Sequence, residues 1–296
     1  MITVYGHAKI NMYLRVLGRR ADGFHDICSV TQSIGLADEL VISDHAEDSV
    51  VMEGSIPEAE NIVTKAIRLL KARTGSRRSA RIRVRKRIPV GAGLGGGSAD
   101  AAAALVGLNR LWRLGLGPQE LEQTGRELGA DVPLCLRGGT LLVEGRGERL
   151  TPLPALKDAH IVVASPEVTV ATGGAYDRLD EMGGDGRAAS VAGVIDALSA
   201  ADLSKLANSM YNSFQALTEG DLPVIAALMS RAVEAGAAGA SLSGTGAAVF
   251  SVSPTPDGAA SVVEALRPIC RRLFATEPVS EGVRYSSRQG ARGVGR

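Results

Sequence analysis

The amino-acid sequence predicts an α+β fold divided into two domains. Alternating apolar and polar residues at 79–88 predict a strand, whereas the apolar spacing at 61–73 is that of a helix. With 296 residues and 45% hydrophobic content, the chain is long enough to bury two cores. Strands and helices mixed along one chain in this way are typical of the α+β class.

The opening segment alternates with period two over residues 8–16, which predicts a strand whose one face carries Lys9 and Asn11. Strand-like character resumes at 29–42, after a turn at 21–25. Asn61 is expected to cap the helix that follows it, because a side-chain oxygen there can accept from the first free N–H groups.

Beyond the strand at 79–88, Ser98 is expected to cap a helix that ends near Trp112. Pro118 is expected to open another that ends near Leu128, since proline suits the first helical position. Segments 138–143 and 160–164 read as strands.

The second half is expected to hold helices near 203–217 and 222–235, a glycine-rich turn at 244–246 and a strand at 247–252. The proline-rich stretch 151–156 is the best domain boundary. The prediction is therefore one domain over residues 1–152, a second over 153–284, and a disordered tail over 285–296.

Charge and cysteine content exclude several classes of function. Thirty-three basic residues against 32 acidic ones leave a net charge of +1, which gives no pull toward nucleic acid or membrane. Cys28, Cys135 and Cys270 are odd in number and far apart, as expected of reduced thiols in a cytoplasmic protein. The N-terminal residues show no targeting peptide. A small-molecule partner, a cytoplasmic location, and a monomer or weak homodimer are expected.

A glycine-rich loop is the most informative motif, with five glycines in the seven positions from Gly91 to Gly97. So many glycines indicate that backbone comes very close to another group, and N–H groups at a helix N-terminus attract anions. Phosphate is the expected anion. The candidate contact residues are Pro89, Val90, Gly91, Ala92, Gly93, Leu94, Gly95, Gly96, Gly97, Ser98 and Ala99.

Three other interpretations of the loop are possible. Gly91, Gly93 and Gly96 match the dinucleotide fingerprint, but that motif belongs in a first βαβ unit. A Walker A loop needs a lysine before its serine or threonine, and Ser98 has none. A purely structural glycine turn is the third. Lys86, just before the loop, is the candidate cation for the phosphates, although most cations of 77–87 are expected on a solvated strand face.

Four segments together resemble the GHMP kinases: Ala8–Asn11 followed by Arg20–His25, then Pro89–Ala99, Leu128–Pro133 and Ser243–Gly246. The resemblance implies an N-terminal ATP domain with a ribosomal-protein-like fold and a left-handed βαβ crossover. It also implies a C-terminal α/β sandwich domain. The Asp-Gly-Phe-His segment is similar to the branch acting on 4-diphosphocytidyl-2-C-methyl-D-erythritol, in the methylerythritol phosphate route to isoprenoids.

That resemblance implies transfer of the ATP γ-phosphate to the 2-hydroxyl of this alcohol, with Mg²⁺ accompanying the nucleotide. Asp131 would be the general base, and Lys9, with Asn11 beside it, would keep that carboxylate ionised. From spacing alone, an N-cap is the more common interpretation of Asp131, and an exposed strand lysine is the more common one of Lys9. The sequence identifies no metal ligand.

The resemblance also implies a pyrimidine pocket, in which Phe24 and Tyr176 sandwich the cytosine ring and His25 reads its edge. Both aromatic residues lie in segments that read as loops, where a hydrophobic plug is the ordinary alternative. The remaining substrate candidates are Thr172, Gly244, Thr245 and Gly246.

The chain departs from the family pattern at three positions. Phe24 replaces a usual tyrosine, and Ser213 and Gln215 replace two usual acids, which puts in doubt any cap or ion pair those acids make. The rival functions are another GHMP kinase, acting on homoserine, mevalonate or a sugar, and a non-catalytic nucleotide sensor. Nucleic-acid binding through the basic strand has no interleaved aromatic residues to support it.

Overall fold

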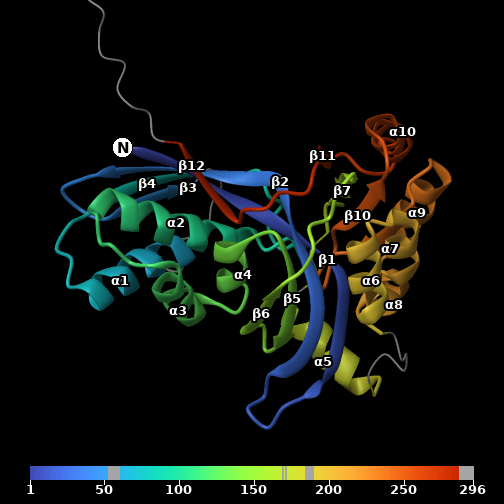
Figure 1. Ribbon diagram of the computed structural model, residues 1–296, viewed down its shortest axis with the longest axis horizontal. Helices are drawn as coiled ribbons and strands as arrows, with labels where there is room; N and C mark the ends of the chain where they lie inside the picture. The colour runs from blue at the N-terminus through green and yellow to red at the C-terminus, as the bar shows by residue number, and fades with distance from the viewer. Residues whose placement is uncertain (53–60, 169, 171, 184–189, 287–296) are drawn as a thin grey trace, which may run out of the picture.

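The computed structural model describes residues 1–52, 61–168, 170, 172–183 and 190–286 (Figure 1). Of the tail predicted to be disordered, residues 287–296 lie outside the described residues. The prediction is wrong for Tyr285 and Ser286, because they pair with Val4 and Thr3 in a strand. Two sheets with attached helices make up the described chain. Ten helices are described: α1 (Ile62–Thr74), α2 (Gly96–Trp112), α3 (Pro118–Leu128), α4 (Val132–Arg137), α5 (Thr172–Glu181), α6 (Ala192–Ala200), α7 (Leu203–Ser209), α8 (Gln215–Asp221), α9 (Pro223–Glu234) and α10 (Pro256–Leu266).

The larger sheet has β12, β1, β2, β4 and β3 in spatial order, with β5 and β6 continuing from β2 and β8 beside β1. Pairing is antiparallel except for the β3–β4 and β1–β8 pairs. Its described strands are β1 (Ile2–Arg19), β2 (His25–Asp44), β3 (Ser49–Met52), β4 (Ala80–Arg85), β5 (Thr140–Gly145), β6 (Arg149–Pro152), β8 (Tyr211–Asn212) and β12 (Val283–Ser286).

The long β1–β2 hairpin carries the first functional residues. Its register shifts between His7 and Lys9 and again between Asn11 and Tyr13. Such bulges bend a strand and re-aim its side chains. One half of the hairpin pairs with β12 and β4, and the other with β5 and β8. Lys9 and Asn11 therefore lie between the half of the hairpin that pairs with β12 and β4 and the half that pairs with β5 and β8.

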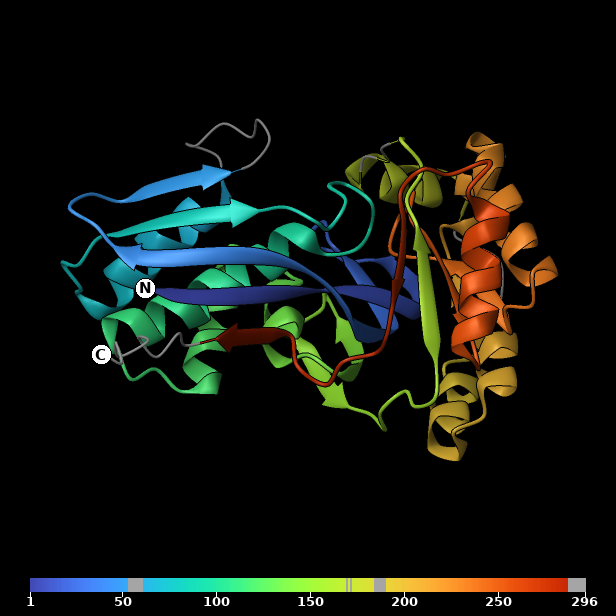
Figure 2. The ribbon, with the colours of Figure 1, turned by 90° about the horizontal axis from the view of Figure 1, so that it is seen from above.

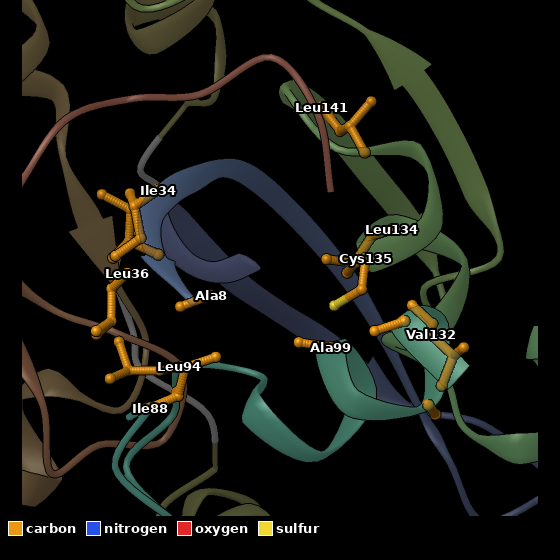
Figure 3. Packing of buried hydrophobic residues seen from close by; sticks show 14 of the residues in the cluster. Ala8, Ile34, Leu36, Ile88, Leu94, Ala99, Val132, Leu134, Cys135 and Leu141 are labelled. Carbon is orange, nitrogen blue, oxygen red and sulfur yellow. The ribbon is translucent and has the colours of Figure 1, made fainter. Parts of the chain in front are cut away.

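Helices α1–α4 cover one face of this sheet (Figure 1). The alanine-rich α2 packs closely on β1. The packing is so close that a side chain at Gly6 would overlap the Ala99 carbonyl. Apolar side chains from the sheet, the glycine loop, α2 and α4 meet in one buried cluster (Figure 3). Figure 3 labels Ala8, Ile34, Leu36, Ile88, Leu94, Ala99, Val132, Leu134, Cys135 and Leu141.

The smaller sheet is antiparallel, in the order β11–β7–β10–β9, and helices α6–α10 lie on its far side from the larger sheet (Figures 1 and 2). Its own apolar cluster includes Phe214, Leu228 and Val262. Its strands are β7 (His160–Ala164), β9 (Gly239–Leu242), β10 (Val249–Ser253) and β11 (Leu273–Thr276).

After β11 the chain runs back across the molecule, and β12 pairs antiparallel with β1 (Figure 2). The Gly282 carbonyl accepts from the His7 N–H at 2.9 Å, and Val279 N–H donates to the Ser33 carbonyl at 2.9 Å. The last described strand thus joins the larger sheet. Limits of 1–152 and 153–284 for the two domains stay a prediction, as does the handedness of the crossover from β3 through α1 to β4.

Several element predictions are confirmed. Asn61 caps α1 by accepting from the Val63 N–H, α3 spans Pro118–Leu128 as predicted, and so does the strand His160–Ala164. No helix within the described ranges is long and apolar enough to cross a membrane.

Three element predictions are wrong. Ser98 is not a cap, because Gly95 at φ 71° allows α2 to begin at Gly96. The helix expected at 203–217 is interrupted by β8, whose pairing with β1 outweighs local helix propensity. The segment around Tyr176, read as a loop, belongs to helix α5.

Candidate active site

A cleft of about 840 Å³ lies where the glycine loop, the β1–β2 hairpin, α5 and the 243–246 turn come together. Most of the residues predicted from the sequence line it. They are Lys9, Asn11, Phe24, His25, Lys86, Pro89, Val90, Gly91, Ala92, Gly93, Leu94, Gly95, Gly96, Gly97, Ser98, Asp131, Tyr176, Gly244 and Thr245.

Three predicted residues do not line the described cleft wall. Ala99 is fully buried in the first turns of α2, where it packs on β1. Gly246 lies behind the turn, with its N–H donating to the Ser243 carbonyl at 3.0 Å. Thr172 opens α5, but its side chain lies outside the described residues.

The glycine loop reaches α2 through three left-handed residues, Gly91, Gly93 and Gly95, at φ 69°, 79° and 71°. Other residues rarely adopt this conformation, which explains why glycine recurs at every second position. The free N–H groups at the α2 N-terminus follow directly, so the cleft has the anion-attracting feature that the sequence predicted.

Lys9 and Asn11 lie together on the cleft floor. The Lys9 Nζ donates to Asn11 Oδ1 at 2.6 Å and lies 3.9 Å from Asp131 Oδ2. Lys9 is almost fully buried, whereas 42% of the Asp131 side chain is exposed. A buried ammonium thus faces a carboxylate that a substrate can reach.

The alternative interpretations of these two residues do not fit this geometry. Asp131 precedes α4, but its side chain makes no capping hydrogen bond. Lys9 is 6% exposed, so it is not a solvated strand lysine. Both side chains instead point into the cleft.

Beneath the loop, Lys86 lies between two buried carboxylates. Its Nζ donates to Asp100 Oδ2 at 2.5 Å and to Asp38 Oδ2. Burial opposes the charged lysine, but these two carboxylates hold the pKa of Lys86 above its usual value. Burial, opposed by Lys86, raises the pKa of Asp100 to about 8. The lysine predicted to meet phosphates is therefore already paired.

Asp38 also accepts from two backbone N–H groups, those of Arg87 at 2.5 Å and Ile88 at 2.9 Å. It thereby fixes the end of β4 where the chain turns into the glycine loop. Sequence analysis missed Asp38 and Asp100, since their role depends on contacts between elements that are far apart in the chain.

The predicted aromatic pair lies in the outer part of the cleft. Phe24 is 54% exposed, and the Arg146 guanidinium lies 3.8 Å from its ring centroid. Tyr176 is packed differently, with its ring 4.7 Å from that of His25 and 4.8 Å from that of Phe214. Burial and the nearby Asp131 charge raise the pKa of Tyr176 to about 12, so its hydroxyl stays protonated.

The His25 ring has a partner that the sequence did not reveal. Its Nε2 lies 2.9 Å from Asp180 Oδ1 on α5. The contact ties the start of β2 to α5. Arg146, in the turn between β5 and β6, is a further cleft residue that no sequence motif indicated.

The two neutral replacements of family acids keep acceptor roles. Ser213 Oγ accepts from the Val16 N–H at 3.0 Å, and Gln215 Oε1 accepts from Ser241 Oγ at 3.3 Å. Both are contacts that a carboxylate could make, so neither change opens a gap in the structure.

Comparisons with known proteins agree with this geometry. Residues 61–139 match the family model of the GHMP kinases N-terminal domain, and residues 194–270 match that of the C-terminal domain. The 4-diphosphocytidyl-2-C-methyl-D-erythritol kinase of Symbiobacterium thermophilum is 41% identical over 269 residues, covering 90% of this chain and 95% of that protein. The enzyme of the same name from Alkaliphilus metalliredigens is 38% identical over 283 residues, covering 94% and 97%.

Among solved structures, a crystal structure of 4-(cytidine 5'-diphospho)-2C-methyl-D-erythritol kinase matches with a TM-score of 0.78 and 32% identity. The match covers 93% of this chain and 98% of that one. A homoserine kinase from Cytophaga hutchinsonii has a TM-score of 0.77 at 19% identity, covering 96% and 97%, which is a likeness of fold alone.

The chain therefore belongs to the GHMP kinases, and within them to the family of 4-diphosphocytidyl-2-C-methyl-D-erythritol kinases. The predicted family, the two-domain α+β fold and the kinase class are confirmed. Use of ATP follows from membership in this family of kinases.

Proposed function

We propose that this enzyme transfers the γ-phosphate of ATP to the 2-hydroxyl of 4-diphosphocytidyl-2-C-methyl-D-erythritol. The observation that carries the proposal is the place of the Lys9–Asp131 pair. The glycine loop and Phe24, His25 and Tyr176 line the same cleft as this pair. The relatives named 4-diphosphocytidyl-2-C-methyl-D-erythritol kinase support this substrate over homoserine, mevalonate or a sugar.

Asp131 is the group proposed to take the proton of the attacking hydroxyl. Its exposed carboxylate can reach a bound alcohol, and Lys9 places a positive charge 3.9 Å from it. Phosphoryl transfer depends mainly on positioning and on stabilising developing charge. A buried ammonium is well suited to both, because it is held at one point by Asn11.

The glycine loop is proposed to hold the phosphates through its N–H groups. The pairing of Lys86 with Asp38 and Asp100 supports a role beneath the loop, and direct contact of Lys86 with phosphate stays a prediction. Phe24 and Tyr176 are proposed to stack on the cytosine ring from either side. The contact of His25 with Asp180 supports a fixed imidazole at its edge.

Mg²⁺ is proposed to arrive with the nucleotide. Kinases commonly hold this ion with one or two side chains and the phosphate oxygens. In the described part of the chain no three His, Cys, Asp or Glu side chains are grouped so that they could hold a metal ion. The Ser98 hydroxyl, at the cleft end of the glycine loop, would offer it one oxygen ligand, and its charge would offset that of the phosphates. The cytoplasmic location, the oligomeric state and the lack of a nucleic-acid partner stay predictions.

The test is ADP release from ATP and Mg²⁺ with four alcohols in parallel: 4-diphosphocytidyl-2-C-methyl-D-erythritol, homoserine, mevalonate and galactose. The proposal expects turnover with the cytidyl alcohol alone. Turnover with another alcohol would be consistent with a kinase but would contradict the proposed pyrimidine pocket. ATP binding without turnover of any of the four would favour a nucleotide sensor.

A further inference from the structure

The proposed function assigns no role to the segment that joins the second domain to β1. Here β8 pairs with β1 in parallel, with Leu14 opposite Asn212. Asn212 is 4% exposed and does not line the cleft. Its side chain nevertheless connects to the catalytic groups through one turn of backbone.

The Asn212 carboxamide uses both of its ends. Its Nδ2 donates to the Leu242 carbonyl at 2.9 Å and to the Gly244 carbonyl at 2.8 Å, while its Oδ1 accepts from the Phe214 N–H at 2.9 Å. The two carbonyls flank Ser243, so one side chain clamps the start of the 243–246 turn. An apolar substitute would leave two buried acceptors without these donors, which is costly.

The clamped turn bears on the cleft at two points. The Gly244 N–H donates to Asn11 Oδ1 at 3.0 Å, the oxygen that also accepts from Lys9 Nζ. The Ser243 hydroxyl donates to the Gly93 carbonyl of the glycine loop at 3.0 Å.

Asn11 cannot rotate to compensate for a shift of the turn. Its Nδ2 donates to Ser29 Oγ at 2.9 Å, and that hydroxyl donates to the Tyr13 carbonyl at 2.6 Å. A displaced Gly244 N–H would therefore leave Asn11 Oδ1 with Lys9 as its remaining partner among these contacts.

We infer that Asn212 is a positioning residue for phosphoryl transfer. By fixing the Gly244 N–H on Asn11 Oδ1, it sets where Lys9 lies relative to Asp131. The inference rests on the proposed function for its effect on rate, while the contact chain itself belongs to the fold. Small misplacements of catalytic groups reduce rates far more than they reduce binding.

The direct test is Asn212→Asp. The variant keeps the shape and the acceptor for Phe214, but puts a carboxylate oxygen against the two carbonyls in place of the donating Nδ2. We expect kcat to fall by about 10- to 100-fold, with KM for both substrates within about threefold of wild type. Asn109→Asp is the matched control, since Asn109 makes an equivalent pair of backbone contacts to Leu116, outside the cleft. A kcat for Asn212→Asp equal to that of the control would overturn the inference.

A coupling experiment separates positioning from general loss of stability. If Asn212 acts through Asn11, then Asn212→Asp should lower kcat much less in an Asn11→Ala background than in wild type. Contacting residues show such non-additivity, whereas independent ones do not. Equal fold-losses in the two backgrounds would contradict the proposed route.

Hydrogen exchange at the Gly244 N–H gives a readout besides activity. It should be faster in Asn212→Asp than in Asn109→Asp, and equal exchange would overturn the inference. Should the wild-type enzyme turn over none of the alcohols, the proposed function fails while this measurement still decides the contact chain. Asn212→Ala, which lacks the repelling carboxylate, serves in the same measurements if Asn212→Asp does not fold.

Discussion

Lys9 and Asp131 differ in burial although they lie 3.9 Å apart, and that difference suits their proposed roles. The ammonium is buried, held by Asn11, and cannot leave the cleft floor. The carboxylate makes no capping hydrogen bond and faces the space that a substrate would fill. The same contrast marks the aromatic residues, since Phe24 is exposed beneath Arg146 and Tyr176 is packed on His25 and Phe214. One face of the proposed pyrimidine pocket is thus fixed, and the other is open to solvent.

The fixed face gives the clearest prediction at the residue scale. Tyr176→Ala should raise KM for the cytidyl alcohol by about 5- to 150-fold, the equivalent of about 1–3 kcal/mol of base stacking. KM for ATP should hardly change, because Tyr176 lies on α5 and not in the phosphate loop. Steady-state kinetics with each substrate varied in turn measures both constants. Tyr285→Ala is the control, since Tyr285 lies on β12 and pairs with Arg110 outside the cleft. Equal rises in the two KM values would count against the sandwich.

At the scale of elements, β2, the end of β4 and the start of α2 are joined under the glycine loop by Asp38, Lys86 and Asp100. Local patterns predicted much of this region, because alternation, capping and proline placement act within a few residues. The glycine motif predicted the loop as well. The carboxylates of Asp38 and Asp100 could not be predicted in the same way, since both read as ordinary polar residues until folding brings Lys86 between them.

Tertiary contacts also explain the errors in the element predictions. Asn212 and Tyr211 pair with β1 across nearly two hundred residues of sequence, so no local signal breaks the helix there. Helix α5 was read as a loop because Gly173 and Gly174 obscure its periodicity. Residues supplied by separate elements, such as Arg146 and Asp180, have no motif that links them to the site.

The buried group of Asp38, Lys86 and Asp100 predicts how the stability of the protein depends on pH. Because burial raises the pKa of Asp100 to about 8, the folded state holds a proton that the unfolded state has released above about pH 4. The wild-type protein should therefore lose stability relative to Asp100→Asn as pH rises from about 4 to about 8, by at most about 1.4 kcal/mol per pH unit. Urea unfolding of both proteins at pH 5, 6, 7 and 8 measures this difference.

Asp38→Ala is the companion variant. It removes one partner of Lys86 and the acceptor of two backbone N–H groups, so it should cost about 3–5 kcal/mol at pH 7. A pH-independent difference between wild type and Asp100→Asn would show that Asp100 is ionised in the folded state at neutral pH.

At the scale of the whole molecule, the two domains contact each other at several points. The second domain contacts the first through β8 and the 243–246 turn, and the last described strand returns to β1. Gly282 packs so closely on α4 that an added side-chain carbon would overlap the Cys135 carbonyl. The cleft is therefore built by both domains, and its geometry depends on their fixed placement.

Because the two domains contact each other at these points, we expect the chain to unfold in a single cooperative transition. Fluorescence of Trp112, the one tryptophan, reports on the helices of the first domain, and far-ultraviolet circular dichroism reports on the whole chain. The two transitions should coincide. Gly282→Ala should shift both together, by about 1–3 kcal/mol of overpacking. Gly220→Ala, in α8 where an added carbon meets nothing within 4 Å, should lower neither transition, because alanine favours the helix. Two separated transitions would contradict the prediction that the two domains unfold together.

The central claim is that one cleft brings ATP and the cytidyl alcohol together at Asp131. Its most direct test is the single-turnover rate of phosphoryl transfer from radiolabelled ATP to 4-diphosphocytidyl-2-C-methyl-D-erythritol, in wild type and in Asp131→Asn. The account predicts labelled phosphate on the 2-hydroxyl with wild type, and a rate about 10²- to 10⁴-fold lower in a folded, ATP-binding Asp131→Asn. A near-normal rate in that variant would remove Asp131 from the mechanism and contradict the account.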